Sequence, residues 1–543
     1  MAAFVRGIAL TAGTVGAMNV LIRLKDGVDG TDRFAEHTNR EHRKHPFSGM
    51  HSPLFPTEEQ VEIVGTHFPN YLHMLPTDLE TFKKQQTIQS PVSLLPLARC
   101  PVPMDRTEAS IIAVGGPPAL ISSALEKKVV YIRDSRKHPA SKGAANHIES
   151  DAPTEAPTTY PPTRFLANQI FRTCFGYVAL RSVEKTGHFP WRTLNWTGWI
   201  KHPKEWPTGI RIALLFQRET MKDSQQREKQ MADVAEKCRD GEAFYNELNE
   251  ALSYQLLSDP HGSYYMARNL SERVELETTG HLLKNEDRLM EFESPEEFCA
   301  EYGFTPQVEL IGKKTHDRII SADYESLIGT HLERNGGSVI DGTLLTVYSD
   351  ETSTGGMIEY RKKGSAASEF LPFSKLLLSL GSQPILDSSG RSLFDLVSAR
   401  GVSTLAFIYV PQEQKIPPLV VCGDTNHVTV LGRQTDPIPG EDGKLYYRYL
   451  VRMTSGACIT PNCAEEDSAD YDASIAVGLI ASVRKTLGFK VEVIVAYGCN
   501  RHVSQYGETR WHPLHPDIAA QVGAGGGGFT RGSEGAKFLT SAD

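Results

Sequence analysis

Two glycine-rich turns are the segments of this chain best suited to hold a phosphate group. One reads VGGPPAL over residues 114–120, and the other reads GAGGGGFT over residues 523–530. Glycines let backbone N–H groups approach a pyrophosphate closely, and a helix that begins after the turn adds further N–H groups. The two turns therefore predict a dinucleotide-binding site.

The sequence around each turn predicts the strand and the helix that such a site requires. Residues 109–135 read as an apolar strand, the first turn, a short helix and a second strand, which is the βαβ opening of a dinucleotide-binding domain. KLLLSLGSQPI at 375–385 predicts a buried strand that runs into glycine. The second turn lies just before a predicted C-terminal helix.

Taken in this order, these pieces resemble the FAD-dependent oxidoreductases of the D-amino-acid-oxidase-like superfamily, which includes glycine oxidase and sarcosine oxidase. The resemblance also rests on the strand pair around Gly342 to Tyr360, on an expected turn at Gly498-Cys499-Asn500-Arg501, and on Gly535 beyond GGGGFT. It covers residues 108–140, 325–385 and 450–543. It implies an α/β fold in which a Rossmann-like FAD-binding domain is interleaved with a mixed-sheet α+β substrate domain. In such a fold the flavin carries the redox chemistry.

The resemblance implies cofactor contacts from the two turns, the second strand and the strand that ends in glycine. The candidate residues are Gly115, Gly116, Ala119, Arg133, Asp134, Gly381, Gly525, Gly526, Gly527, Gly528, Phe529 and Thr530. Arg501 resembles the arginine that holds the substrate carboxylate in amino-acid oxidases, although His502 stands where that family has proline; a structural or surface arginine is the alternative interpretation. Tyr506, His512 and His515 lie nearby in the sequence and have no assigned role.

Two departures from the family pattern bear on FAD binding. Val114 stands where the fingerprint has its first glycine, and a side chain there is expected to strain or reshape a tight turn; Ala119, at the third glycine, is a small replacement. The second strand ends in Arg133 where an acid normally binds the ribose hydroxyls; Asp134 follows, and a shift of one residue would let it replace the missing contact. Together these departures predict weakened or absent FAD binding.

The composition excludes several other classes of protein. The chain has 543 residues, 40% of them hydrophobic and 23% charged, with a formal net charge of −9. These values are typical of a multi-domain globular protein and argue against a nucleic-acid partner. The eight cysteines form no C-x-x-C pair, so we expect reduced thiols and no metal site.

The N-terminus predicts an uncleaved helix that spans a membrane or packs on a partner. Sixteen uncharged residues, 7–22, lie between Arg6 and Arg23, and no acidic residue precedes Asp26. As a helix they would extend about 24 Å, slightly less than the roughly 30 Å hydrocarbon core. A cationic, acid-free start is also shared by mitochondrial import sequences, which makes a cleaved presequence the alternative.

These features predict a division of the chain into eight segments. They are a membrane or partner-packed helix (1–24), an N-terminal extension (25–107), the first part of the FAD-binding-like domain (108–140), a Pro- and Thr-rich loop (141–164), a helical insertion with substrate-like domain (165–324), the second FAD-binding-like part (325–385), a substrate-like part (386–450) and a return to the FAD-binding-like domain (451–543).

Two functions fit this sequence. The first is an oxidoreductase fold with reduced or lost catalysis that serves as an accessory subunit of a mitochondrial inner-membrane complex, with other protein subunits as partners and lipid contacted through residues 7–22. The second is an active FAD-dependent oxidase or dehydrogenase of an amine, amino acid or hydroxy acid. The N-terminal helix and the departures at Val114 and Arg133 favour the first, whereas the intact GGGGFT and Arg501 favour the second.

Overall fold

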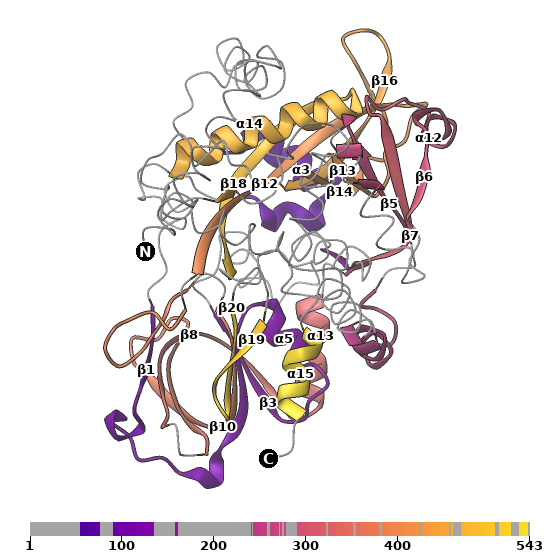
Figure 1. The fold of residues 1–543 in the computed structure, drawn as a ribbon. Coiled ribbons are helices and arrows are strands. Elements are labelled where there is room, and N and C mark those ends of the chain that lie inside the picture. The colour runs from indigo at the N-terminus through magenta and orange to yellow at the C-terminus, as the bar shows by residue number, and fades with distance from the viewer. Residues whose placement is uncertain are drawn as a thin grey trace, which may run out of the picture.

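The structure is a computed structural model of the 543-residue chain. It describes residues 55–76, 91–134, 158–160, 240–257, 261–277, 290–350, 354–454, 458–459, 468–504, 510–522 and 532–540, with short gaps at 242, 271, 274–275, 322–323, 381–382, 395 and 423–425. Within these residues the chain is organised around two β-sheets, one above the other in Figure 1.

The first sheet has the strand order β11-β1-β8-β3-β2-β10-β20-β19, and β9 pairs with both β8 and β10. Its members are β1 (Val92–Leu95), β2 (Ser110–Gly115), β3 (Val129–Asp134), β8 (Ser338–Tyr348), β9 (Gly356–Lys362), β10 (Glu369–Ser379), β11 (Ile385–Leu386), β19 (Arg510–His515) and β20 (Ile518–Val522). Strands β8, β3, β2, β10 and β20 run parallel, with β2, the first of them in the chain, at the centre. This is the strand order of a doubly wound dinucleotide-binding fold, so the expected α/β fold class is confirmed.

The central strands of this sheet are apolar on both faces because both faces are covered. Ala113 and Tyr131 join a core with the helices α5 (Pro117–Ser123), α13 (Tyr324–Arg334) and α15 (Gly532–Thr540). Ile112, Val114 and Ile132 point to the other face and join a core with the β8-β9-β10 strands. The βαβ unit expected from residues 109–135 is therefore present as β2, α5 and β3.

The second sheet has the strand order β17-β12-β16-β14-β13-β5-β7-β4, with β15 on β16, β18 on β12 and β6 on β7. Its strands are β4 (Thr158–Tyr160), β5 (His261–Ala267), β6 (Glu291–Glu293), β7 (Leu310–Ile320), β12 (Leu396–Pro411), β13 (Leu419–Cys422), β14 (Asn426–Arg433), β15 (Ile438–Pro439), β16 (Leu445–Thr454), β17 (Cys458–Ile459) and β18 (Lys490–Ser504). The short helix α12 (Pro295–Tyr302) lies between β6 and β7 in the chain.

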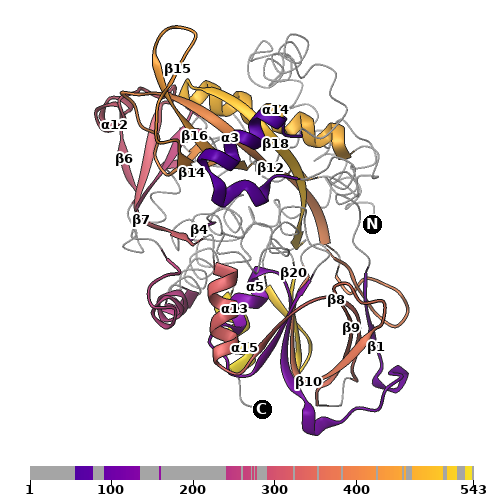
Figure 2. The same ribbon diagram turned by 180° about the vertical axis from the view of Figure 1, so that it is seen from behind.

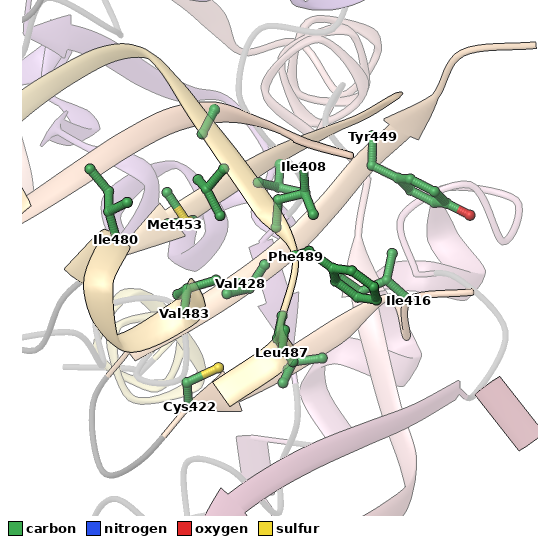
Figure 3. Close-up of a cluster of buried hydrophobic side chains, with 14 of the residues drawn as sticks. Ile408, Ile416, Cys422, Val428, Tyr449, Met453, Ile480, Val483, Leu487 and Phe489 are labelled. Carbon is green, nitrogen blue, oxygen red and sulfur yellow. The ribbon is translucent and has the colours of Figure 1, made fainter. Parts of the chain in front are cut away.

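Each face of the second sheet is covered by a different part of the chain. Helix α14 (Ser468–Leu487) packs on one face, where it contributes Ile480, Val483 and Leu487 to a large apolar cluster (Figure 3). The opposite face is covered by α3 (Glu58–His67) and the 3-10 helix η1 (Pro69–Met74). Two further 3-10 helices, η2 (Leu97–Arg99) and η3 (Arg106–Glu108), lead from β1 to β2.

The alternation of side chains along β12 explains why both faces need a cover. Ala406, Ile408 and Val410 belong to the cluster under α14, whereas Leu405, Phe407 and Tyr409 point to α3 and η1. Successive side chains of a strand point to opposite faces, so a strand that is apolar at every position must be buried on both.

The path of the chain differs from the expected division at its C-terminal part. Residues 451–543 are expected to lie wholly in the FAD-binding-like domain. In the structure, the end of β16 and β18 are strands of the second sheet and α14 packs on that sheet, so the chain returns to the first sheet only at β19. The reason is the long antiparallel ladder in which β18 pairs with β12, from Tyr409↔Lys490 to Leu396↔Ser504. The sequence of β18 shows a strand but not its partner.

The expected N-terminal extension is also divided. Residues 55–76 lie on the second sheet, whereas β1 is a strand of the first sheet and pairs with β8 and β11. The predicted helix within 1–24 and most of the Pro- and Thr-rich loop fall outside the described residues. Among the helices that are described, none is both long and apolar enough to cross a membrane.

Candidate functional site

The first glycine turn joins the centre of the first sheet to helix α5, and its backbone is tightly packed. Gly115 ends β2 with φ at +121°, a conformation that only glycine adopts readily. A Cβ atom at this position would lie 2.6 Å from the carbonyl carbon of Ser379, the last residue of β10. The carbonyl oxygen of Gly115 also accepts a 2.8 Å hydrogen bond from the buried Tyr131 hydroxyl. Glycine is therefore required here by the neighbouring protein backbone.

Val114 does not strain this turn; of the two expected effects, strain or a reshaped turn, the structure shows the second. It lies in the regular part of β2, buried, with Ile132 and Leu378 as its cross-strand partners. Among the described residues, positive φ values outside glycine occur at other sites. The positive φ falls on Gly115, one residue later than the fingerprint alignment placed it, so Val114 keeps an ordinary strand conformation.

The N-terminus of α5 has no backbone N–H group left for a phosphate. A helix begins with four N–H groups that lack partners within the helix, and these are the groups that bind anions. At α5 they belong to positions 116–119. Gly116 donates its N–H to the carbonyl of Ser379 at 2.9 Å, Pro117 and Pro118 have none, and Ala119 donates to the carbonyl of Gly116 at 2.9 Å. All four groups are therefore absent or already bonded.

The end of β3 carries a cluster of three charged side chains in place of a lone acid. The Arg133 Nε atom lies 3.6 Å from a carboxylate oxygen of Glu325, at the start of α13, and 3.6 Å from one of Asp341, its neighbour on β8. The exposed fractions of these side chains are 14%, 8% and 23%, so the cluster is largely buried. One cation between two anions leaves a net charge of −1, which repels a phosphate.

Within the described part of the chain, the cluster is held by charge attraction. The Nε and Nη1 atoms of Arg133 and the Oδ1 atom of Asp341 are buried without a hydrogen-bond partner there. Such an arrangement is costly to break, because removing the arginine leaves two buried carboxylates without a counter-charge. Asp134 follows in β3 with its backbone paired to Gly342; the proposal that it replaces the missing ribose contact stays a prediction.

Only some of the remaining candidate cofactor residues are among the residues that the structure describes. Ala119 is fully buried in α5. Gly381 and the second turn, with Gly525, Gly526, Gly527, Gly528, Phe529 and Thr530, fall outside the described residues. The helix expected after the second turn is present as α15, and a Cβ on its first residue, Gly532, would lie 2.6 Å from Ile121 of α5. The helices that follow the two turns thus pack against each other.

The expected substrate-side residues lie on strands of both sheets. The predicted turn at Gly498 to Arg501 is instead part of the continuous strand β18, where Arg501 pairs with Ala399 of β12. His502 lies in the same strand of the second sheet, whereas His512 and His515 lie on β19 of the first sheet. His515 is bound to the backbone carbonyl of Asp350 through its Nε2 atom. Tyr506 falls outside the described residues.

The residues that decide this site include some that the sequence motif does not contain. Pro117 and Pro118 can be read from the sequence, and because proline has no backbone N–H, they indicate that this helix N-terminus has fewer donors for a phosphate. Ser379, Glu325 and Asp341 reach the site from distant parts of the chain, so no local pattern marks them. No group of three or more metal-ligating side chains occurs in the portion of the chain that the structure describes.

These observations test whether a dinucleotide fits the β2–α5 turn and the end of β3. A pyrophosphate requires free N–H groups at the helix N-terminus, and the ribose requires an acceptor at the strand end. The turn offers no free N–H among its four positions, and the strand end holds an arginine that is already paired with two carboxylates. The residues of the β2–α5 turn do not fit a pyrophosphate, and Arg133 itself cannot accept a hydrogen bond from a ribose hydroxyl.

Comparison with known proteins finds similarity only in structure. No family model matches the chain, and no curated protein matches it. NikD, an amino acid oxidase essential for nikkomycin biosynthesis, is similar at 10% identity over 80% of this chain and 94% of its own, with a TM-score of 0.46. Glycine oxidase from Geobacillus kaustophilus is similar at 11% identity over 56% of this chain and 77% of its own, with a TM-score of 0.39.

A third solved structure names the cofactor. L-alpha-glycerophosphate oxidase from Mycoplasma pneumoniae, with FAD bound, is similar at 12% identity over 57% of this chain and 80% of its own, with a TM-score of 0.41. At this level of identity the similarity concerns the fold and transfers no residue role. All three solved structures are oxidases, and one of them holds FAD.

Proposed function

We propose that this protein is a non-catalytic relative of FAD-dependent oxidoreductases and serves as an accessory subunit of a mitochondrial inner-membrane complex. The observation that carries the proposal is the N-terminus of α5, where Gly116 is bonded to Ser379 and two prolines follow. A helix N-terminus without free N–H groups has lost the feature that makes it an anion site. In this proposal the fold provides a stable structure and surfaces that contact other subunits, without catalysing a reaction.

The charged cluster at the end of β3 supports the same proposal. Arg133 lies between Glu325 and Asp341 as their shared counter-charge, so the residue at the expected ribose-binding position takes part in an internal ion-pair cluster. The membrane and mitochondrial parts of the proposal rest on the cationic, acid-free residues 1–24. Partners of such a subunit are other proteins of the same complex, with residues 7–22 against lipid or against a partner helix.

An active FAD-dependent oxidase of an amine, amino acid or hydroxy acid is the second candidate. The feature that favours it is the glycine run 525–528, which precedes α15 as a phosphate-binding turn would. In that case the β20–α15 connection would have to supply the amide groups that the β2–α5 turn lacks.

The absorbance spectrum of the native protein separates the two candidates. We expect the purified, folded full-length chain to show no flavin absorption band. We also expect mass spectrometry to detect no dinucleotide released when the protein is denatured. Stoichiometric FAD would refute the non-catalytic proposal.

The assembly is tested separately, by fractionation of the cells that make the protein. We expect it in the mitochondrial membrane fraction, resistant to alkaline carbonate extraction, and in a native gel at a mass well above that of one chain. Recovery as a soluble monomer would refute the accessory-subunit part of the proposal, whatever the flavin content.

A further inference from the structure

The N-terminal arm, defined as residues 55–76, covers the face of the second sheet that lies opposite α14. In both views of the fold, α3 and η1 lie between this sheet and the first domain, while α14 lies on the far side of the sheet (Figures 1 and 2). The arm therefore lies on the side of the second sheet that faces the first sheet.

The apolar contact of the arm is centred on Phe68. Its ring is 4% exposed and lies 6.1 Å from the ring of Phe407, which is fully buried in β12. Gly432 of β14 makes room for it, since a Cβ there would lie 3.2 Å from the Cδ1 atom of Phe68. The register of β14 against β16 shifts between Val430 and Gly432, which places this glycine beneath the ring. The sheet thus has a recess shaped for one side chain of the arm.

Polar contacts fix the arm at two further points. The Gln60 side chain donates from Nε2 to the carbonyl of Val493 at 3.0 Å and to a carboxylate oxygen of Glu492 at 2.9 Å. The Tyr71 hydroxyl donates to the carbonyl of Leu431 at 3.0 Å. Gln60 is only 8% exposed and its bond to Val493 is buried, so these contacts specify the register of the arm.

The local sequence prepares the arm for this position. Thr57 caps α3 by accepting from the Gln60 N–H at 3.2 Å, and the Gln60 side chain accepts from the Thr57 N–H at 3.0 Å. This capping box uses the Oε1 atom of Gln60 and leaves its Nε2 atom free to reach β18. The same glutamine therefore starts the helix and binds the sheet.

We propose that this face of the second sheet is a peptide-binding surface whose occupant is the chain's own residues 55–76. Because residues 55–76 bind the second sheet, they attach the preceding residues 1–54 to it. A membrane or partner that binds residues 1–54 is thereby connected to the second sheet.

The proposal is tested by cutting the chain between the arm and β1. A site for a specific protease is placed within residues 77–90, the full-length protein is cleaved, and the fragments are analysed by size exclusion and mass. We expect the N-terminal fragment to remain bound to the rest of the protein. Separation of the two fragments in native buffer would overturn the proposal.

Substitutions in the arm show which contacts hold it. Phe68→Ala is expected to weaken retention of the fragment by about 100-fold or more, because truncation of a buried phenylalanine costs that much in binding. Val61→Ala is the matched control on the same helix, since Val61 is 36% exposed and its truncation should leave retention unchanged. Equal retention of the Phe68→Ala and Val61→Ala fragments would also overturn the proposal.

A second variant guards against misfolding of Phe68→Ala. Gln60→Ala removes the two hydrogen bonds to β18 without emptying the recess for Phe68, and we expect retention to weaken about tenfold. An unchanged affinity would show that these bonds do not hold the arm. The flavin spectrum is recorded on the same samples, so failure of the arm proposal and failure of the non-catalytic proposal give different results.

Discussion

Replacing Gly115 by alanine tests whether the first glycine turn is kept for packing. The added Cβ would lie 2.6 Å from the Ser379 carbonyl carbon and would require a φ near +121° from an L-residue. The backbone strain costs about 1–3 kcal/mol, and forcing β2 and β10 apart adds about 1–3 kcal/mol. We therefore expect a loss of about 4 kcal/mol in the free energy of unfolding of the first domain.

Gly364→Ala is the matched control for this substitution. Gly364 also has a positive φ, +81°, but a Cβ there meets no atom within 4 Å, so only the strain of about 1–2 kcal/mol applies. The difference of about 2–3 kcal/mol corresponds to about 4–12 °C in melting temperature for a domain of 150–250 residues. Thermal unfolding followed by circular dichroism measures it on flavin-free protein. Equal melting temperatures for the two variants would refute the argument that neighbouring backbone requires Gly115.

Three further measurements address buried polar groups. Burial, and then a hydrogen bond to a glutamate, raise the pKa of Tyr409 to about 12; since an unfolded tyrosine ionises near pH 10, stability should fall as the pH rises from about 10 to 12, and urea midpoints should fall less steeply in Tyr409→Phe. Burial raises the pKa of the Cys422 thiol to about 12, so iodoacetamide at pH 8 should leave Cys422 intact in the folded protein while the partly exposed Cys299 reacts. Arg133→Leu should lower the unfolding free energy by about 3 kcal/mol, because two buried carboxylates lose their counter-charge; an unchanged urea midpoint would contradict that role.

Local sequence patterns predicted the elements around the first turn because those elements depend on local signals. The apolar runs that form β2 and β3, the prolines that begin α5 and the glycine after β10 are all short-range features. The strand order then follows from the connectivity of a right-handed βαβ fold. For this reason the α/β fold class was within reach of the sequence alone.

The assignment of strands to the two sheets could not be predicted from the sequence, because it depends on pairing between residues that are distant in the chain. β18 reads as an isolated apolar strand, yet its partner β12 lies about 100 residues earlier in the chain, as in the pair Ala399↔Arg501. The same applies to Phe68, whose recess is created by a glycine in β14. Neither contact leaves a periodic signal in either segment.

The site shows that glycine in a phosphate-binding motif and free N–H groups are separate requirements. Gly115 is required because the backbone of Ser379 lies against it, and this requirement persists when no ligand is bound. The N–H groups at the start of the following helix are a separate requirement. Pro117 and Pro118 lack two of them, and those of Gly116 and Ala119 already donate to backbone carbonyls. A sequence motif scored on its glycines therefore reports packing, whereas binding depends on the donors that remain.

The second domain shows the same separation between fold and site. Its inner face keeps the apolar side chains that a ligand pocket would need, such as Leu405 and Phe407, yet Phe68 of the arm already covers them. Closure at the helix N-terminus and closure at the sheet face involve different residues, and neither requires the other. At both places, groups of the kind that contact ligands are instead engaged by the protein itself, which adds hydrogen bonds and buried apolar contacts to the fold.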